Sequence, residues 1–123
     1  MSNIQDLVDD YIAMWNETDP TARARLAEQV WEPEASYVDP MAEANGRETI
    51  DATIGAVQGQ FPGMSFALAG EVDAHHNLAR FNWQLGTAQV PDMVVGFDVA
   101  VISDGGKLQA VHGFLDKVPA ELG

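Results

Sequence analysis

Apolar residues in the first half of the chain recur at the spacing of α-helices. In the first segment they fall three or four positions apart, at Ile4, Leu7, Val8, Tyr11, Ile12 and Trp15. This spacing predicts an amphipathic helix with Tyr11 in the middle of its buried face. Asp19 as a cap and Pro20 in the first turn predict a second helix, which runs towards Trp31 and is stopped by Pro33. A third helix is expected within residues 45–63.

After Gly63 the apolar period shortens to two, which is typical of β-strands. In the segment "ARFNWQL", Phe81, Trp83 and Leu85 share one face of the predicted strand. The segment "MVVGFDVAVI" is apolar on both faces, as in a strand that is covered from both sides. Four strands are expected here, over residues 65–73, 79–85, 93–102 and 108–116. Three helices followed by mostly antiparallel strands predict an α+β fold.

The composition predicts a single domain over residues 1–123, since 46% of the residues are hydrophobic and no segment resembles a linker. The chain carries 19 acidic and 6 basic side chains, a net charge of −13. This charge disfavours nucleic acids and anionic membranes as partners. The start "MSNIQDLVDD" is polar and acidic, unlike a signal peptide, and no apolar run has membrane-spanning length, so a cytoplasmic protein is expected.

Few residues in this chain are suited to binding a metal ion. It has no cysteine and three histidines. His75 and His76 are adjacent, so their side chains point in different directions, and a solvated hairpin is expected there rather than a metal site. We interpret His112 as a histidine of the sheet. The three polar residues that alternate with Trp83 either line a pocket or form an outward-facing stripe: Arg80, Asn82 and Gln84.

Asp98 is the residue that departs most from its surroundings. Every residue within four positions on either side of it is apolar or glycine. Burying an isolated carboxylate is costly, so this group must be paired, solvated in a cavity or protonated. Its same-face neighbours Gly96 and Ala100 are small, which leaves room in front of the carboxyl. Two interpretations remain open: a core aspartate satisfied by the backbone or by Arg80, or a carboxyl that faces a pocket with a raised pKa.

Asp39 ends the short run "YVDP", residues 37–40. The following proline forces extended geometry on Asp39 and holds its carboxylate at a fixed exit from a strand. A turn uses aspartate in the same way without any chemistry, so a purely structural role is the first alternative. Tyr11, on the buried helix face, requires a partner for its hydroxyl group. Tyr11 and a neutral Asp98 would both donate hydrogen bonds to an oxyanion, while an ionised Asp39 would act as a base.

Three segments, in this order along the chain, resemble those of the ketosteroid isomerases: "YIAMWNETD", "VDP" and "VVGFDVAV". The order of helices and strands resembles the fold of nuclear transport factor 2 over essentially the whole chain. This resemblance implies a cone-shaped barrel, also called cystatin-like, in which a curved, mostly antiparallel sheet packs on three N-terminal helices. It also implies the catalytic roles of an oxyanion-hole tyrosine for Tyr11, a general base for Asp39 and a protonated acid for Asp98.

Within this superfamily the chain most closely resembles the SnoaL-like group, which includes polyketide cyclases. The triad of limonene epoxide hydrolases would require acids where this chain has Asn82 and Gly113. The resemblance implies a homodimer and a cofactor-independent enzyme that moves a proton on a small hydrophobic carbonyl compound, by isomerisation or aldol-type cyclisation. The alternative is a non-catalytic module for ligand binding or assembly. Substrate contacts are expected from Trp15, Tyr37, Phe61, Trp83, Val111 and Gly113.

Overall fold

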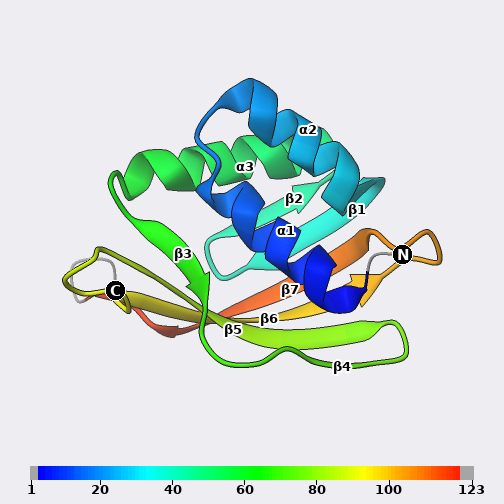
Figure 1. Ribbon diagram of the computed structural model, residues 1–123. Coiled ribbons are helices and arrows are strands. Elements are labelled where there is room, and N and C mark those ends of the chain that lie inside the picture. The colour runs from blue at the N-terminus through cyan, green and yellow to red at the C-terminus, as the bar shows by residue number, and fades with distance from the viewer. Residues whose placement is uncertain (1–2, 120–123) are drawn as a thin grey trace.

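The computed structural model describes residues 3–119, which form three helices and seven strands (Figure 1). The helices are α1 (Ile4–Asn16), α2 (Pro20–Val30) and α3 (Arg47–Gln60). The strands are β1 (Trp31–Asp39), β2 (Ala42–Asn45), β3 (Ser65–Leu68), β4 (Asp73–His75), β5 (Leu78–Gly86), β6 (Val94–Ile102) and β7 (Leu108–Lys117). The α+β class predicted from the change of period is therefore confirmed.

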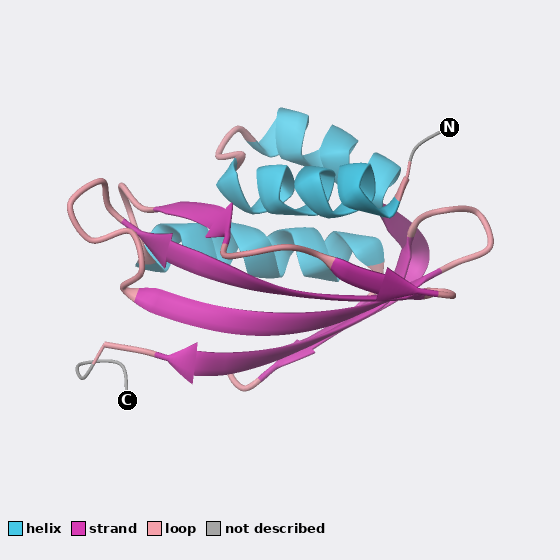
Figure 2. Ribbon diagram, turned by 60° about the horizontal axis from the view of Figure 1, so that its bottom comes forward, coloured by secondary structure: helices cyan, strands magenta, loops and turns pink. Residues whose placement is uncertain are grey.

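The strands form one curved sheet, and the three helices cover one of its faces (Figures 1 and 2). The strand order is β2-β1-β7-β6-β5-β3, and β4 pairs with β5 outside this path. All pairs are antiparallel except β1 with β7. The sheet does not close on itself. This is the predicted cone of a curved sheet packed on N-terminal helices, and the space between the two layers is where a site can form.

Two element boundaries differ from the sequence prediction. Helix α2 ends at Val30, and Pro33 lies inside β1. Proline is tolerated there because the pairing of β1 with β7 is interrupted between Trp31 and Ser36, so no ladder hydrogen bond from residue 33 is lost. The strand expected over residues 65–73 is divided into β3 and β4, with Gly70 between them at a φ of 105° that favours glycine.

N-terminal caps and a largely buried ion pair stabilise the helices. Asn3 caps α1 by accepting a hydrogen bond from the Asp6 amide, and Asp19 caps α2 as its sequence predicts. The buried Arg23 of α2 pairs with Asp51 of α3 at 2.6 Å. The ion pair joins α2 to α3, and α1 and α3 contribute side chains to the site described below.

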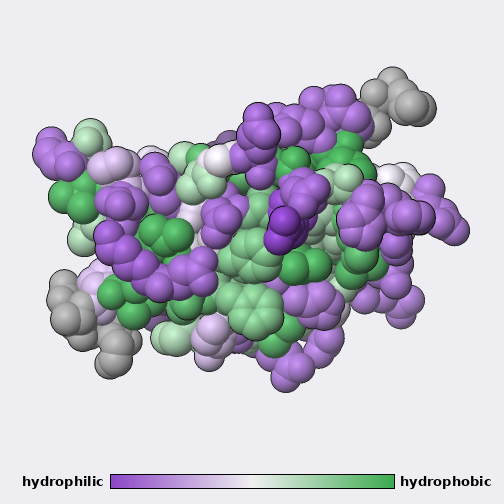
Figure 3. Space-filling model, turned by 90° about the horizontal axis from the view of Figure 1, so that it is seen from below, coloured by the Kyte–Doolittle hydropathy of each residue, from purple (hydrophilic) through white to green (hydrophobic). Residues whose placement is uncertain are grey.

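Strand β6 differs on its two faces. Val94, Gly96, Asp98 and Ala100 are buried against the helices, whereas Val95, Phe97, Val99 and Val101 are only half-buried. The prediction that β6 is covered from both sides is therefore wrong for the single chain. Figure 3 views the face away from the helices and shows apolar side chains among polar ones. Among residues 3–119, no helix is long and apolar enough to cross a membrane.

Candidate functional site

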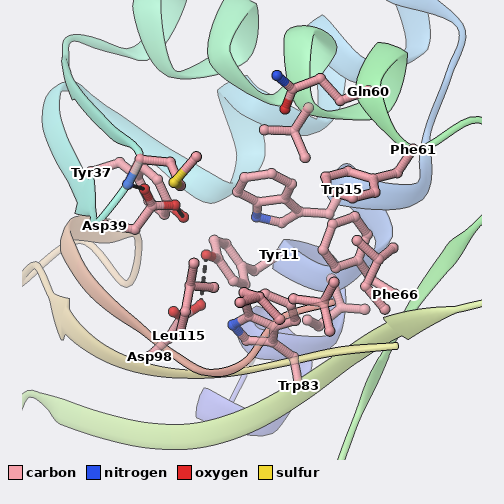
Figure 4. Close-up of a pocket in the computed structure, with 16 residues that line it drawn as sticks. Tyr11, Trp15, Tyr37, Asp39, Gln60, Phe61, Phe66, Trp83, Asp98 and Leu115 are labelled. Carbon is pink, nitrogen blue, oxygen red and sulfur yellow. Dashed lines mark hydrogen bonds between the residues drawn. The ribbon is translucent and has the colours of Figure 1, made fainter. Parts of the chain in front are cut away.

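A cavity of about 340 Å³ lies between the helices and the inner face of the sheet (Figure 4). Its wall is mainly aromatic and aliphatic, with two carboxyl groups and two phenols as its acidic and hydroxyl groups. The lining residues are Tyr11, Ile12, Trp15, Tyr37, Asp39, Met41, Val57, Gln60, Phe61, Phe66, Trp83, Leu85, Val94, Asp98, Leu115 and Val118. This composition suits a small hydrophobic ligand that carries few polar groups.

Asp98 is the buried acid of the cavity, with 2% of its surface exposed. The Tyr11 hydroxyl donates a hydrogen bond of 2.8 Å to its Oδ2, and no group among residues 3–119 donates to its Oδ1. Burial raises the pKa of Asp98 to about 6, because desolvation outweighs the opposing effects of the hydrogen bond from Tyr11 and of the nearby Trp83 indole. Arg80, considered above as a partner, instead pairs with Asp73 at 2.9 Å on the surface.

Asp39 is half-buried at the end of β1 and is held by three donors. The amides of Met41 and Ala42 donate to its Oδ1, each at 2.8 Å. The Tyr37 hydroxyl donates to its Oδ2 at 2.5 Å. The turn expected from "YVDP" is therefore present, and the same carboxylate lies in the cavity wall. Both interpretations of this residue fit its geometry.

The two phenols act as neutral donors in this cavity. Burial, followed by the nearby Asp98, raises the pKa of Tyr11 well above its ordinary value. Burial and the charges of Asp98 and Asp39 raise the pKa of Tyr37 as well. Tyr11 is also enclosed by edge-on contacts with the rings of Trp15, Trp31 and Phe81. Both hydroxyl groups therefore keep their protons over the working range of most enzymes.

Two glycines leave the space that this arrangement requires. A Cβ on Gly96 would overlap the indole ring of Trp83, its cross-strand partner. The indole therefore lies across β6, next to Asp98. A Cβ on Gly113 would lie 2.9 Å from Asp98 Oδ1 and 3.2 Å from Asp39 Cβ. The two acids thus flank Gly113, and Figure 4 shows their side chains on the same side of the cavity.

Of the nine site residues predicted from the sequence, seven line the cavity: Tyr11, Trp15, Tyr37, Asp39, Phe61, Trp83 and Asp98. Val111 and Gly113 do not. Val111 is fully buried in the core, between its cross-strand partners Tyr37 and Ala100. Gly113 lies in β7 behind the Asp98 carboxyl, where its lack of a side chain makes room for the acid.

The polar stripe on β5 does not line the cavity. Trp83 and Leu85 face inward, so Arg80, Asn82 and Gln84 lie on the opposite face. The interpretation as an outward-facing stripe is therefore the one that the structure favours. His75 and His76 are exposed where β4 turns into β5. No group of three His, Asp or Glu side chains among residues 3–119 is placed to hold a metal ion.

Sequence reasoning missed nine lining residues: Ile12, Met41, Val57, Gln60, Phe66, Leu85, Val94, Leu115 and Val118. Phe66 and Leu85 carried a usable signal, since they alternate on the same inward faces as Trp83. Met41 and Val118 carried no such signal, because neither belongs to an apolar pattern of a helix or strand. Both are largely exposed, at 74% and 38%, and only the fold brings them to the edge of the cavity.

Comparison with protein-family models and with curated proteins finds no match. Among solved structures, the chain is similar to a candidate isomerase of the SnoaL-like family from Agrobacterium tumefaciens, at 38% identity and a TM-score of 0.86. The match covers 91% of this chain and 96% of that one.

Two more distant structures share the fold. An NTF2-like protein from Cytophaga hutchinsonii is 14% identical with a TM-score of 0.69, covering 94% of this chain and 92% of that one. A candidate SnoaL-like polyketide cyclase from Jannaschia is 14% identical with a TM-score of 0.68, covering 94% of this chain and 90% of that one. The identity and coverage of the Agrobacterium match extend the likeness from fold to family. The chain belongs to the SnoaL-like family.

Proposed function

We propose that this protein is a cofactor-independent enzyme that moves a proton on a small, hydrophobic carbonyl compound. The observation that carries this proposal is the placement of Asp39, and of the Tyr11–Asp98 pair, in the wall of one apolar cavity. One acid is half-buried and held by three donors, while the other is buried and has a raised pKa. This difference between the surroundings of the two carboxyl groups supports Asp39 as the base and Asp98 as the acid.

In the proposed reaction, the Asp39 carboxylate removes a proton from the carbon next to the substrate carbonyl. The electron pair of the broken C–H bond forms a C=C bond, and the carbonyl π pair moves to the oxygen. Tyr11 and protonated Asp98 donate hydrogen bonds to this enolate oxygen. In an isomerisation, Asp39 returns the proton to another carbon. In an aldol-type cyclisation, the enolate carbon attacks a second carbonyl of the same molecule. The π pair of that carbonyl moves to its oxygen, which takes the proton that Asp39 removed.

Solvent deuterium exchange tests this proposal without knowledge of the natural substrate. The protein is incubated in D₂O with a panel of mono- and bicyclic ketones, and loss of the α-proton signal is followed by NMR. We expect exchange to exceed that in buffer, and Asp39→Asn to lower the enzymatic rate about a hundredfold or more. Asp104→Asn is the matched control, because Asp104 is exposed in the turn between β6 and β7. Unaltered exchange in Asp39→Asn, with the fold intact, contradicts its role as the base.

A second candidate function is non-catalytic binding of the same class of ligand. It is favoured by the turn at Asp39, whose three hydrogen bonds also suit a purely structural residue. Under this alternative, ketones bind in the cavity, but the wild-type protein does not accelerate their deuterium exchange. Binding measured by calorimetry beside the exchange rates therefore separates the two functions.

We also propose that two copies associate through the outer face of the sheet. Phe97 and Phe114 are cross-strand partners on this face, and Phe114 is 56% exposed. Half-buried Val95 and Val99 extend the apolar row along β6. An exposed apolar row of this kind is typical of an interaction site. Sedimentation of Phe114→Glu should show a shift from dimer to monomer, and a wild-type protein that sediments as a monomer contradicts the proposal.

A further inference from the structure

The indole N–H of Trp15 is a buried donor that the mechanism above does not use. Trp15 lines the cavity and is 5% exposed. No group among residues 3–119 accepts a hydrogen bond of full geometry from its Nε1. The N–H lies near enough to the Tyr11 hydroxyl to lower the pKa of that phenol, against the larger rise that burial causes. Buried polar groups are almost always paired in proteins, so an unpaired one in a cavity wall points to a ligand atom as its partner.

The position of Trp15 aims this donor at the reacting groups. Trp15 follows Tyr11 by four residues on α1, which places both side chains on the same face of the helix. The Trp15 ring centre lies 6.3 Å from that of Tyr11 and 5.7 Å from that of Tyr37. Figure 4 shows the indole nitrogen on the side of the ring that faces the two carboxyl groups.

The two hydroxyl groups in the cavity wall already have acceptors, unlike the indole N–H of Trp15. The Tyr11 hydroxyl donates to Asp98 and the Tyr37 hydroxyl to Asp39, both within the protein. An oxygen of a ligand that approaches Tyr11 therefore competes with the Asp98 carboxyl group, whereas the Trp15 N–H has no acceptor of full hydrogen-bond geometry among residues 3–119. Trp15 is thus a buried donor that an entering ligand engages without breaking a hydrogen bond of the protein.

We propose that Trp15 Nε1 donates a hydrogen bond to the carbonyl or enolate oxygen of the ligand, beside the Tyr11 hydroxyl. The ligand class that follows is a hydrophobic molecule that presents an oxygen acceptor to the Trp15–Tyr11 corner of the cavity. This inference rests on the proposed function for the chemical class of the ligand, but it requires binding only and not turnover.

Trp31 provides an internal control for this inference. Its Nε1 is also buried without an acceptor among residues 3–119, yet Trp31 does not line the cavity. A ligand oxygen in the cavity should therefore affect the N–H signal of Trp15 and leave that of Trp31 nearly unchanged. The chain has three tryptophans, so their indole signals form a small and readily assigned set.

The test uses 1-tetralone and tetralin, which are similar in shape and differ in the carbonyl oxygen. Indole ¹H–¹⁵N signals are assigned with Trp15→Phe and Trp31→Phe and followed as each compound is added. We expect 1-tetralone to move the Trp15 proton signal downfield, tetralin to move it much less, and neither to move the Trp31 signal. The inference is overturned if both compounds move the Trp15 signal alike, or if neither compound binds at millimolar concentration.

A ratio of affinities separates the hydrogen bond from lost ring contacts. Trp15→Phe removes both the N–H and part of the apolar wall, so the affinity of 1-tetralone is divided by that of tetralin. We expect this ratio to fall about fivefold in Trp15→Phe, as loss of one hydrogen bond implies, and to stay unchanged in the wall variant Phe66→Leu. An unchanged ratio in Trp15→Phe overturns the inference. Absence of deuterium exchange, with the expected ratio, overturns only the proposed catalysis.

Discussion

Asp39 and Asp98 are the same residue type in the wall of one cavity, but their hydrogen-bond donors and solvent exposure differ. Asp39 is half-buried and accepts hydrogen bonds from two backbone amides and from Tyr37. Asp98 is 2% exposed, accepts a hydrogen bond from Tyr11 at its Oδ2, and has no donor to its Oδ1 among residues 3–119. The two carboxyl groups therefore differ in the number of their donors and in the access of solvent.

Under the proposed function, this difference gives each acid a separate role. The donors around Asp39 stabilise a carboxylate at a fixed position, as a base requires. The apolar surroundings of Asp98 raise its pKa and favour the neutral form, which can donate a hydrogen bond. Each prediction below changes one acid or one of its donors, so that the two environments can be compared directly.

Exchange of each acid for asparagine should affect turnover very unequally. Asp39→Asn removes the base and should lower kcat/KM by about a hundredfold to ten-thousandfold. Asp98→Asn retains a neutral N–H donor in the place of a neutral acid, so its loss should be about tenfold or less. Steady-state or exchange kinetics on the best ketone of the panel measure both. A larger loss in Asp98→Asn than in Asp39→Asn would reverse the assignment of base and donor.

The same pair of variants should differ in stability with pH. The pKa of Asp98 is raised in the folded protein, from 3.8 to about 6. The folded state therefore holds this proton more tightly, and the resulting stability is complete below pH 3.8 and is lost as pH rises through 6. About two pKa units correspond to about 3 kcal/mol. Asp98→Asn should thus be more stable than wild type by about this amount at pH 8, and nearly equal to it near pH 4.

Urea unfolding of both proteins at several pH values measures this difference. Asp104→Asn serves as the control, since it removes an exposed acid and should keep the pH dependence of the wild type. If Asp98→Asn and wild type lose stability in parallel between pH 4 and pH 8, Asp98 does not titrate as a buried acid.

The sequence identified both acids because each breaks a local pattern. Asp98 interrupts an apolar strand, and its burial on the inner face of β6 is as expected. Asp39 precedes Pro40 at the end of β1, where extended geometry was predicted. The helical stripe likewise placed Tyr11 on the buried face of α1. Patterns of this kind are local, so residues next to one another in the chain are enough to reveal them.

The rest of the site depends on contacts between distant segments. Met41 lies in the turn between β1 and β2, Gln60 at the end of α3 and Val118 just after β7. These segments meet only in the folded protein, and the sequence neighbours of the three residues do not predict this meeting. Val111 was expected at the cavity, but its side chain lies in the core. A strand pattern predicts which face of a strand is buried, and does not predict whether a side chain on that face reaches a cavity. The short strand β2 was also missed, since four residues carry too little periodicity.

The pH profile of turnover should show which form of Asp98 is active. If the neutral acid donates to the enolate, kcat/KM falls as pH rises above about 6, by up to about tenfold per pH unit, to a plateau supported by Tyr11. Asp98→Asn has no proton to lose and should lack this fall. A wild-type rate that instead rises between pH 5 and pH 7 would identify Asp98 as the base.

The smallest expected effect comes from removing one hydroxyl group beside each acid. Tyr37→Phe leaves Asp39 with two backbone donors, so unfolding free energy should fall by about 1 kcal/mol. Tyr11→Phe removes the stronger of the two donors near the buried Asp98 and leaves the Trp83 indole, so the loss at pH 8 should be about 2–3 kcal/mol. Both changes remove a single oxygen and keep the ring, which makes each the control of the other. Equal losses would mean that the two carboxyl groups depend on their phenols alike, and the contrast between them would then lie in solvent access alone.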